Sequence, residues 1–174
     1  EIIIDEKGEP LSIGNISLLN PKHVSIILQN YSKIKEDTYT ALDSDARWLI
    51  YDLENIIDNG LKIKYPLYFD ILVYKIDKKT NEEIQSLIYQ DYGKKHSTVY
   101  ISNLWRNKIP KIIAQNAKED YVNWYYSNVE RGKWKRCSRC GEVKLMHHYF
   151  FSHNNTSRDS FYSICKECRR KKSE

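Results

Sequence analysis

Four cysteines arranged as two CxxC pairs constrain the fold of this 174-residue chain more than any other feature. Cys137 and Cys140 form the first pair, and Cys165 and Cys168 form the second. A CxxC turn can direct two thiolates at one ion, so two such turns supply the four sulfur ligands of a closed tetrahedral zinc site. The spacing therefore predicts one structural Zn²⁺ bound by all four cysteines. Redox disulfides and an iron–sulfur cluster are the alternatives for the same residues.

The residues around the cysteines predict a small β-hairpin module. Gly141 follows the first pair, where the chain must reverse and direct backbone N–H groups at sulfur. Two aromatic runs, residues 149–151 and 161–164, flank a polar stretch and are typical of two hairpin arms. Residues 131–174 are too few to bury a large core, so we expect the metal to supply most of their folding free energy.

Basic residues are concentrated at the C-terminal end. The net charge of the chain is +5, but residues 131–174 hold 12 basic and 4 acidic side chains, whereas residues 1–60 hold 5 basic and 11 acidic. This asymmetry predicts that the basic end binds a polyanion, with Arg169, Arg170 and Lys171 as candidate DNA contacts. A solvated basic tail is the alternative.

Two helices are predicted in the middle of the chain. Pro66 is a good start for a helix over residues 67–78, where apolar residues recur at helical spacing. Thr80 and Glu83 have the spacing of a capping box that opens a second helix. Gly93 should end this second helix in a left-handed conformation.

A third helix should follow after a short turn. Ser97 or Thr98 can cap it. Pro110 lacks an N–H and cannot continue the helical ladder without a kink, but it is well suited to the first turn of a following helix. The order of helix, turn, helix, glycine-containing turn and helix is typical of a helix-turn-helix. In such motifs the last, short helix enters the major groove of DNA.

The third helix and the turn before it carry donors suited to phosphates and base edges. The candidate DNA-binding residues are Lys94, Lys95, His96, Ser97, Thr98, Tyr100, Asn103, Arg106, Asn107 and Lys108. Residues 67–114 resemble the helix-turn-helix of sigma factor region four and of related phage and bacterial regulators, because Thr80-Asn-Glu-Glu-Ile84 matches the usual opening of its positioning helix. The resemblance implies base contacts from Ser97, Thr98, Tyr100, Asn103 and Arg106, and phosphate contacts from Lys94, Lys95, Asn107 and Lys108. A small helical bundle with a solvated polar face is the alternative.

Residues 137–172, CSRCGEVKLMHHYFFSHNNTSRDSFYSICKECRRKK, resemble the four-cysteine zinc-ribbon or treble-clef segments of phage and mobile-element proteins. More distantly, they are similar to the zinc frame of HNH nucleases of the phage recombination-endonuclease type. In that family a histidine before the second cysteine pair is the general base, and His153 lies at about this distance from Cys165. The acidic metal ligand of such a nuclease is missing here, which favours surface or phosphate-contacting roles for His147, His148 and His153. A role in zinc ligation is the remaining alternative, although the four cysteines already complete a tetrahedral site.

The flanking regions carry no functional motif. A helix is predicted from residues 43–44 to Gly60, short strands at residues 2–4 and 16–19, and a short helix at residues 24–28. The acidic outer face of the first of these helices is either solvated or contacts RNA polymerase or another protein subunit.

From Pro110 a long helix is predicted through Val129, with a broad stripe of apolar and aromatic residues. Trp124, Tyr125 and Tyr126 belong to this stripe, and packing explains them better than base stacking does.

Together these patterns predict a mainly α protein, a helical bundle containing a helix-turn-helix, with a small C-terminal zinc ribbon or treble-clef-like β-hairpin module. Its parts would be an acidic N-terminal helical region (residues 1–62), a helix-turn-helix domain with a long covering helix (63–130) and a basic four-cysteine module (131–174). Mean hydropathy is −0.67 and no long uncharged apolar window occurs, so we expect no membrane association.

The function that these parts predict is sequence-specific binding of double-stranded DNA, without enzymatic activity, by a transcription regulator or phage DNA-transaction factor. The expected location is the cytoplasm of a bacterium or phage-infected host, at the nucleoid. One alternative is a zinc-framed HNH-like nuclease targeted by the helix-turn-helix. Another is an adaptor that binds protein in transcription or phage DNA packaging.

Overall fold

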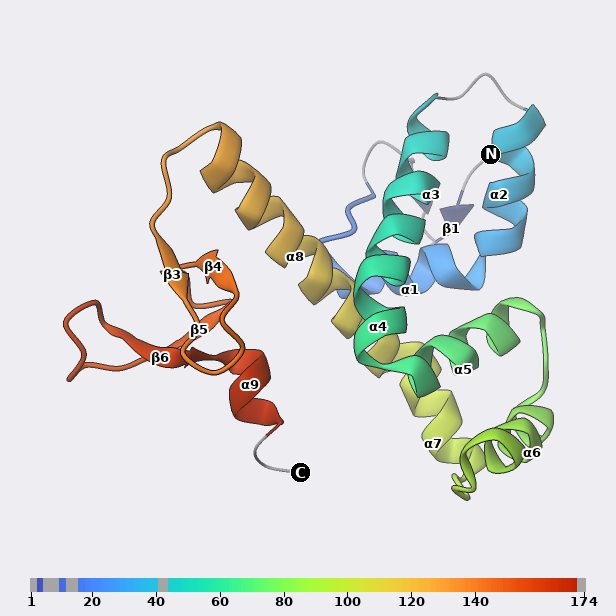
Figure 1. The fold of residues 1–174 in the computed structure, drawn as a ribbon. Helices are drawn as coiled ribbons and strands as arrows, with labels where there is room; N and C mark the ends of the chain where they lie inside the picture. The colour runs from blue at the N-terminus through green and yellow to red at the C-terminus, as the bar shows by residue number, and fades with distance from the viewer. Residues whose placement is uncertain (1–2, 5–9, 12–15, 41–43, 172–174) are drawn as a thin grey trace. The chain divides into compact units, whose positions relative to one another are not determined.

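The structure is a computed structural model, and it describes residues 3–4, 10–11, 16–40 and 44–171. The chain divides into two compact units, residues 1–118 and residues 119–174. The first unit is mostly helical, and the second contains short antiparallel hairpins (Figure 1). The expectation of a mainly helical protein with small C-terminal hairpins is therefore confirmed. Within the described ranges, no helix has both the length and the apolar character needed to cross a membrane.

Helices follow one another closely through the first unit (Figure 1). A short antiparallel pair, β1 (Ile3–Ile4) and β2 (Pro10–Leu11), precedes them. The helices are α1 (Pro21–Gln29), α2 (Tyr31–Thr40), α3 (Ser44–Ile56), the π-helical segment η2 (Ile57–Leu61), α4 (Lys62–Lys64), α5 (Pro66–Ile76), α6 (Asn81–Tyr92), α7 (Thr98–Asn103), the π-helical segment η3 (Leu104–Lys108) and α8 (Ile109–Asn128). The last of these runs from the first unit into the second.

Isoleucine and leucine side chains from these helices form one continuous core in the first unit. Burying each such side chain stabilises the fold by about 1.5–3 kcal/mol relative to leaving it exposed. Fully buried members include Val24, Ile27, Leu53, Leu61, Ile71, Ile84, Ile88, Ile101, Leu104, Ile109 and Ile113. The core therefore joins the N-terminal helices to α5, α6, α7 and the first turns of α8.

The predicted helix ends in the middle of the chain are confirmed. Pro66 occupies the first turn of α5, and Gly93 ends α6 with φ at 65°. Thr80 Oγ1 accepts a hydrogen bond from the Glu83 N–H at 3.2 Å, and Glu83 Oε2 accepts one from the Thr80 N–H at 2.7 Å. Ser97, one of the two expected caps, accepts a bond from the Tyr100 N–H at the start of α7.

We predict that Thr80→Ala lowers the free energy of unfolding by about 1 kcal/mol, because the Glu83 N–H loses its capping acceptor. Urea unfolding of the full chain, followed by circular dichroism at fixed metal concentration, measures this change. Thr80→Ser keeps a hydroxyl and should retain most of the stability. Equal losses in the two variants would contradict a capping role for the hydroxyl.

Pro110 lies in the first turn of α8, which begins at Ile109, as the sequence predicts. Helix α7 continues without a break through η3 into α8, and Pro110 lies inside this run (Figure 1). Pro110 has no N–H to donate to the Arg106 carbonyl, which would be its acceptor in a regular α-helix. The buried Ser25 hydroxyl donates to that carbonyl instead, at 3.4 Å. The π-helical turn of η3 and this bond accommodate the proline.

The prediction that a helix closes at Gly60 is wrong. Helix α3 continues through η2 into α4 and reaches Lys64. Gly60 is buried, and a Cβ atom there would lie 2.3 Å from the Asn116 amide nitrogen. The glycine therefore allows close approach of α8 and does not terminate the helix.

One expectation for the front of the chain is wrong, and one helix there was not predicted. Residues 16–19 form a loop and turn, not a strand, and the turn leads into α1, whose first turn is capped by the Asn20 side chain at the Lys22 N–H. Helix α2 was not predicted, because its residues are mostly polar. Among residues 31–36, Ile34 alone is buried. The predicted helix at residues 24–28 is confirmed within α1, and the strand at 2–4 is observed at Ile3–Ile4.

The second unit consists of the last turns of α8 and two hairpins. Strands β3 (Trp134–Arg136) and β4 (Val143–Leu145) pair antiparallel, as do β5 (Phe151–His153) and β6 (Phe161–Cys165), and α9 (Lys166–Arg170) follows. The second hairpin matches the predicted aromatic arms, although its first strand begins two residues later. The core of the second unit is small, with Phe151 fully buried beside the cysteines.

Candidate metal centre and nucleic-acid surface

The two CxxC pairs converge on one point in the second unit. The four sulfur atoms all lie within 4.8 Å of one another, and the cysteines are free thiols. Cys137 and Cys140 lie in the turn between β3 and β4, Cys165 ends β6, and Cys168 lies in α9. Three are buried and Cys140 is exposed. Four convergent thiols without a disulfide are compatible with a structural metal site.

Backbone N–H groups point at the sulfur of Cys137. The N–H of Cys165 donates to it at 3.3 Å and the N–H of Arg139 at 3.4 Å. Burial opposes charge on Cys137, but these bonds and that from Cys140 lower its pKa to about 6. Burial raises the pKa of Cys165 and, together with bonds to the neighbouring thiols, raises that of Cys168 to about 12. Metal ions bind thiolates and not thiols, so a bound cation would stabilise the ionised form of these cysteines.

Charged side chains tie the loops of the cysteine cluster together. Arg139 Nη1 donates to the Cys168 carbonyl at 2.6 Å. Lys144 forms ion pairs with Glu167 at 2.5 Å and with Glu142 at 3.0 Å. Burial opposes the charge of Lys144, but these two bonds raise its pKa overall. Arg139 and Lys144 thus hold α9 against the first cysteine turn.

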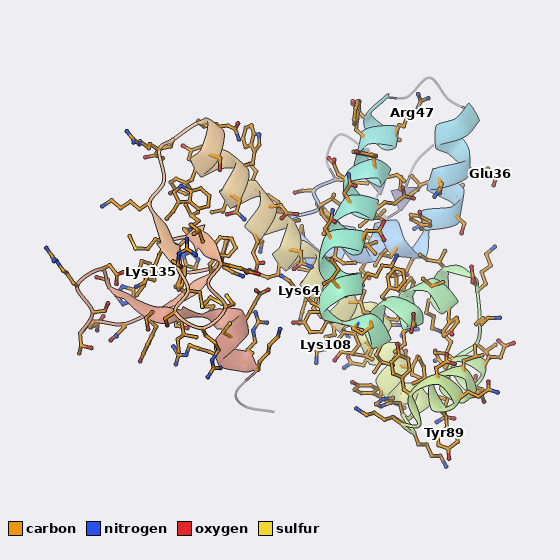
Figure 2. The ribbon with its side chains drawn as sticks, viewed as in Figure 1. Glu36, Arg47, Lys64, Tyr89, Lys108 and Lys135 are labelled. Carbon is orange, nitrogen blue, oxygen red and sulfur yellow. The ribbon has the colours of Figure 1, made fainter. Side chains whose placement is uncertain are left out.

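Another ion pair joins β3 to the loop between β5 and β6. Lys135, labelled in Figure 2, pairs with Asp159, and its ammonium group also donates to the Phe161 carbonyl at 3.1 Å. The same group lies 5.8 Å from the centre of the Phe151 ring. Hydrogen bonds from Lys135, Ser157 and the Phe161 N–H lower the pKa of Asp159 well below its usual range.

The three C-terminal histidines lie apart from the cysteine cluster. His147 Nδ1 accepts a bond from the Tyr149 N–H at 3.2 Å, and burial, with His148 and Lys166 nearby, lowers its pKa. His153 is exposed, with its ring 5.7 Å from that of Phe161. Among the described residues, only the four cysteines form a group of three or more His, Cys, Asp or Glu side chains able to hold a metal ion. No observation therefore places His153 in a nuclease site.

The candidate DNA-binding residues of the middle segment lie on the turn before α7 and along α7 and η3. Most of these side chains are exposed, whereas three are half-buried. The exposed ones are Lys94, Lys95, Ser97, Asn103, Arg106, Asn107 and Lys108, and the half-buried ones are His96, Thr98 and Tyr100.

Tyr100 and His96 fix the turn. The Tyr100 ring packs against the core of the first unit and stacks on the His96 ring at 4.8 Å. Burial and a hydrogen bond with Tyr68 raise the pKa of Tyr100 to about 12. The Gln85 amide donates to the His96 carbonyl, which ties α6 to the turn. The structure thus gives Tyr100 a packing role that the sequence pattern did not indicate.

Asn103, Arg106 and Asn107 lie together on the exposed side of this helical run. The side-chain amide of Asn107 donates to the side-chain oxygen Oδ1 of Asn103 at 2.8 Å. Burial lowers the pKa of Lys75 on α5. The negative charge of Glu82 raises this pKa, and the positive charge of Arg106 lowers it. Lys108, labelled in Figure 2, lies over the Tyr68 ring at 5.3 Å. The carboxamides and the guanidinium form one polar surface.

The cations of α9 are also at the surface. The Arg169 guanidinium stacks on the Tyr162 ring at 4.0 Å, and Arg169, Arg170 and Lys171 are all exposed. Tyr162 was not singled out from the sequence. The sequence does not show that Tyr162 lies opposite a basic helix, because this contact depends on how β6 and α9 pack.

Sequence reasoning also missed Val99. Its side chain is 76% exposed in the first turn of α7, beside the polar candidates. Its exposure could have been predicted from the helical spacing, since Val99 lies off the apolar face made by Ile101 and Leu104.

Comparison of the chain with protein-family models, curated proteins and solved structures found no match.

Proposed function

We propose that this chain is a sequence-specific DNA-binding protein in which α6, the turn after it and α7 act as a helix-turn-helix and the four cysteines hold a structural Zn²⁺. The observation that carries the proposal is the exposed polar surface of Asn103, Arg106 and Asn107 on a helix that begins from a rigid, basic turn.

Local contacts define the conformation of this turn. Gly93 turns the chain out of α6, Gln85 bonds to the His96 carbonyl, and Ser97 caps α7. Lys94 and Lys95 are exposed on this turn. A helix N-terminus beside two cations favours a phosphate, because the helix dipole and the ammonium charges act in the same direction.

The exposed side of α7 and η3 offers the groups that read base edges. An arginine pairs with guanine and an asparagine with adenine in the major groove, while an apolar side chain contacts the thymine methyl group. Arg106, Asn103 and Val99 supply one of each, and all three are exposed. This combination of an arginine, an asparagine and a valine supports sequence-specific contacts with bases more than non-specific electrostatic attraction to DNA.

The donor set supports zinc as the metal. Four thiolates in a closed site suit Zn²⁺, which binds sulfur in tetrahedral geometry without a preference imposed by d-electrons. The ion would hold the β3–β4 turn to α9 and thereby keep Arg169 and its neighbours on the surface. These cations supply a second contact with DNA phosphates.

We predict that Arg106→Ala and Asn103→Ala each weaken binding to the preferred DNA sequence by about 1–3 kcal/mol and reduce discrimination against other sequences. Selection from a random duplex library first identifies the preferred sequence. Fluorescence polarisation at fixed salt then compares that duplex with a scrambled one. The physical reason is loss of hydrogen bonds to base edges, which only the preferred sequence provides.

Two further variants distinguish sequence-specific base contacts from non-specific electrostatic attraction to phosphates. Lys95→Ala should weaken both duplexes alike and reduce the salt dependence, as expected for a phosphate contact. Lys22→Ala removes an exposed lysine at the start of α1 and should bind as the wild type does. Failure of the library to yield a preferred sequence, or unchanged discrimination in both the Arg106 and Asn103 variants, would contradict the proposal.

A further inference from the structure

The second unit carries a row of aromatic rings that the proposed function does not use. Tyr125 and Tyr126, at the end of α8, meet edge to face at 5.3 Å between ring centres. Tyr126 lies 6.3 Å from His147, whose ring contacts those of His148 at 4.1 Å and Tyr149 at 4.7 Å. The row extends from the end of the helix to the loop after β4.

A pocket of about 430 Å³ adjoins this row at the junction of α8 and β3. Tyr126 belongs to both, and Trp134, which is 47% exposed, lines the pocket with residues 127–132. An aromatic wall and polar backbone and side-chain groups thus surround one space. A nucleobase needs this combination, a flat apolar face with hydrogen-bonding edges.

The wall of the pocket is held in place by close packing. A Cβ atom on Gly132 would lie 2.7 Å from the Leu145 side chain and 2.9 Å from the Tyr126 Cβ. The Gly132 N–H also donates to the Tyr126 carbonyl at 3.2 Å. The Gly132 turn is closely packed and hydrogen-bonded, which would limit the ordering cost of stacking a ligand there.

Cations flank the aromatic groups. Arg131 and Lys133 are exposed beside the pocket. Trp134 and Arg136 lie on the same face of β3, because side chains alternate along a strand. The one acidic residue of the lining, Glu130, is engaged by the Tyr125 hydroxyl. Aromatic rings with adjacent cations are the chemistry by which proteins hold single-stranded nucleic acid.

We propose that the pocket at Tyr126 and Trp134 binds an unpaired base of a single-stranded nucleic acid, while Arg131, Lys133 and Arg136 contact its phosphate backbone. This inference deepens the proposed function, and its statement about duplex DNA rests on that function. The preferred ligand becomes a DNA duplex that carries a single-stranded segment.

Binding of labelled oligodeoxythymidine to the metal-loaded full chain tests the pocket by itself. Trp134→Ala should weaken binding at least about fivefold at fixed salt, because one base–aromatic stack is lost. Trp134→Phe should restore most of the affinity, since a ring remains. Trp48→Ala is the matched control, because Trp48 is 64% exposed on α3 in the other unit and should be dispensable.

Photocrosslinking gives a second readout that does not depend on affinity. An oligonucleotide carrying 5-iodouracil should crosslink to a peptide within residues 126–134. Crosslinks only elsewhere, or equal affinities for Trp134→Ala and Trp48→Ala, would overturn the inference. Sequence-selective duplex binding that depends on Arg106 would then still support the proposed function. Conversely, Trp134-dependent binding of the single strand without selective duplex binding would uphold the pocket and contradict the proposed function.

Discussion

Removing the metal ion with a strong chelator should unfold residues 119–174 and leave the helices of residues 1–118 folded. The core of the second unit consists of Phe151 and three cysteines, with Phe150, Phe161 and Ile164 around it. So small a core does not offset the loss of chain entropy by itself. Zinc binding to four cysteines supplies about 10–16 kcal/mol in small zinc domains, so its loss should abolish the fold of this unit.

Elemental analysis and two-dimensional NMR measure this effect. We expect one zinc ion per chain, loss of dispersed amide signals from the second unit after chelation, and their return when zinc is added. Co²⁺ in place of zinc should give the absorption of a tetrahedral thiolate complex.

Cysteine variants test the ligand assignment. Cys165→Ser and Cys168→Ser should lose the metal and the second-unit signals, since both sulfurs belong to the cluster. His153→Ala should keep both, because its exposed ring lies outside the cluster. An unchanged spectrum after complete metal removal would show that the metal does not stabilise this fold.

Gly60→Ala should lower the free energy of unfolding of the first unit by about 1–3 kcal/mol, the usual cost of overpacking a core. The added Cβ atom would lie 2.3 Å from the Asn116 amide nitrogen and 2.9 Å from its Cγ. Asn116 is buried and has a short side chain, so relief requires displacement of the whole amide. Urea unfolding of the metal-loaded chain, followed by helical circular dichroism, measures the loss.

A double-mutant cycle distinguishes this clash from a general intolerance of substitution. In the Asn116→Ala background the clashing amide is gone, and Gly60→Ala should be neutral or stabilising, because alanine favours helix by up to about 1 kcal/mol. Asn116→Ala alone should cost little, since its amide nitrogen has no hydrogen-bond partner among the described residues. Asn59→Ala, at an exposed position in the same π-helical segment, is the control. Equal effects of Gly60→Ala in both backgrounds would contradict the clash.

Local signals were most informative where a few neighbouring residues determine the structure. The capping box of Thr80 and Glu83 and the left-handed Gly93 predicted both ends of α6. The aromatic arms around residues 149–164 predicted the hairpin of β5 and β6. In each case the partner of the decisive group lies within a turn or across one hairpin, so the spacing in the sequence carries the information.

The candidate DNA-binding surface was only partly predictable. The sequence indicated which polar residues lie near the start of α7, but it did not separate the packed Tyr100 from the exposed Asn103 and Arg106. The exposure of Val99 follows from the apolar face that Ile101 and Leu104 define, but no polar pattern marked Val99 as part of this surface. Packing of Tyr100 depends on its contacts with Tyr68 and His96, and the residue spacing within the helix does not specify those contacts.

The sequence by itself determined the four-cysteine cluster, because two CxxC turns can satisfy one tetrahedral ion in few ways. It also determined the helix ends that depend on adjacent residues. The tertiary structure decided that the chain continues as one helical run past Pro110 and past Gly60. Local rules predicted a kink or a new helix at Pro110 and a helix end at Gly60. Ser25 bonds to the Arg106 carbonyl that Pro110 leaves without its usual donor, and Asn116 packs against the glycine. Both partners come from helices distant in the sequence, and contacts of this kind exist only after the chain has folded.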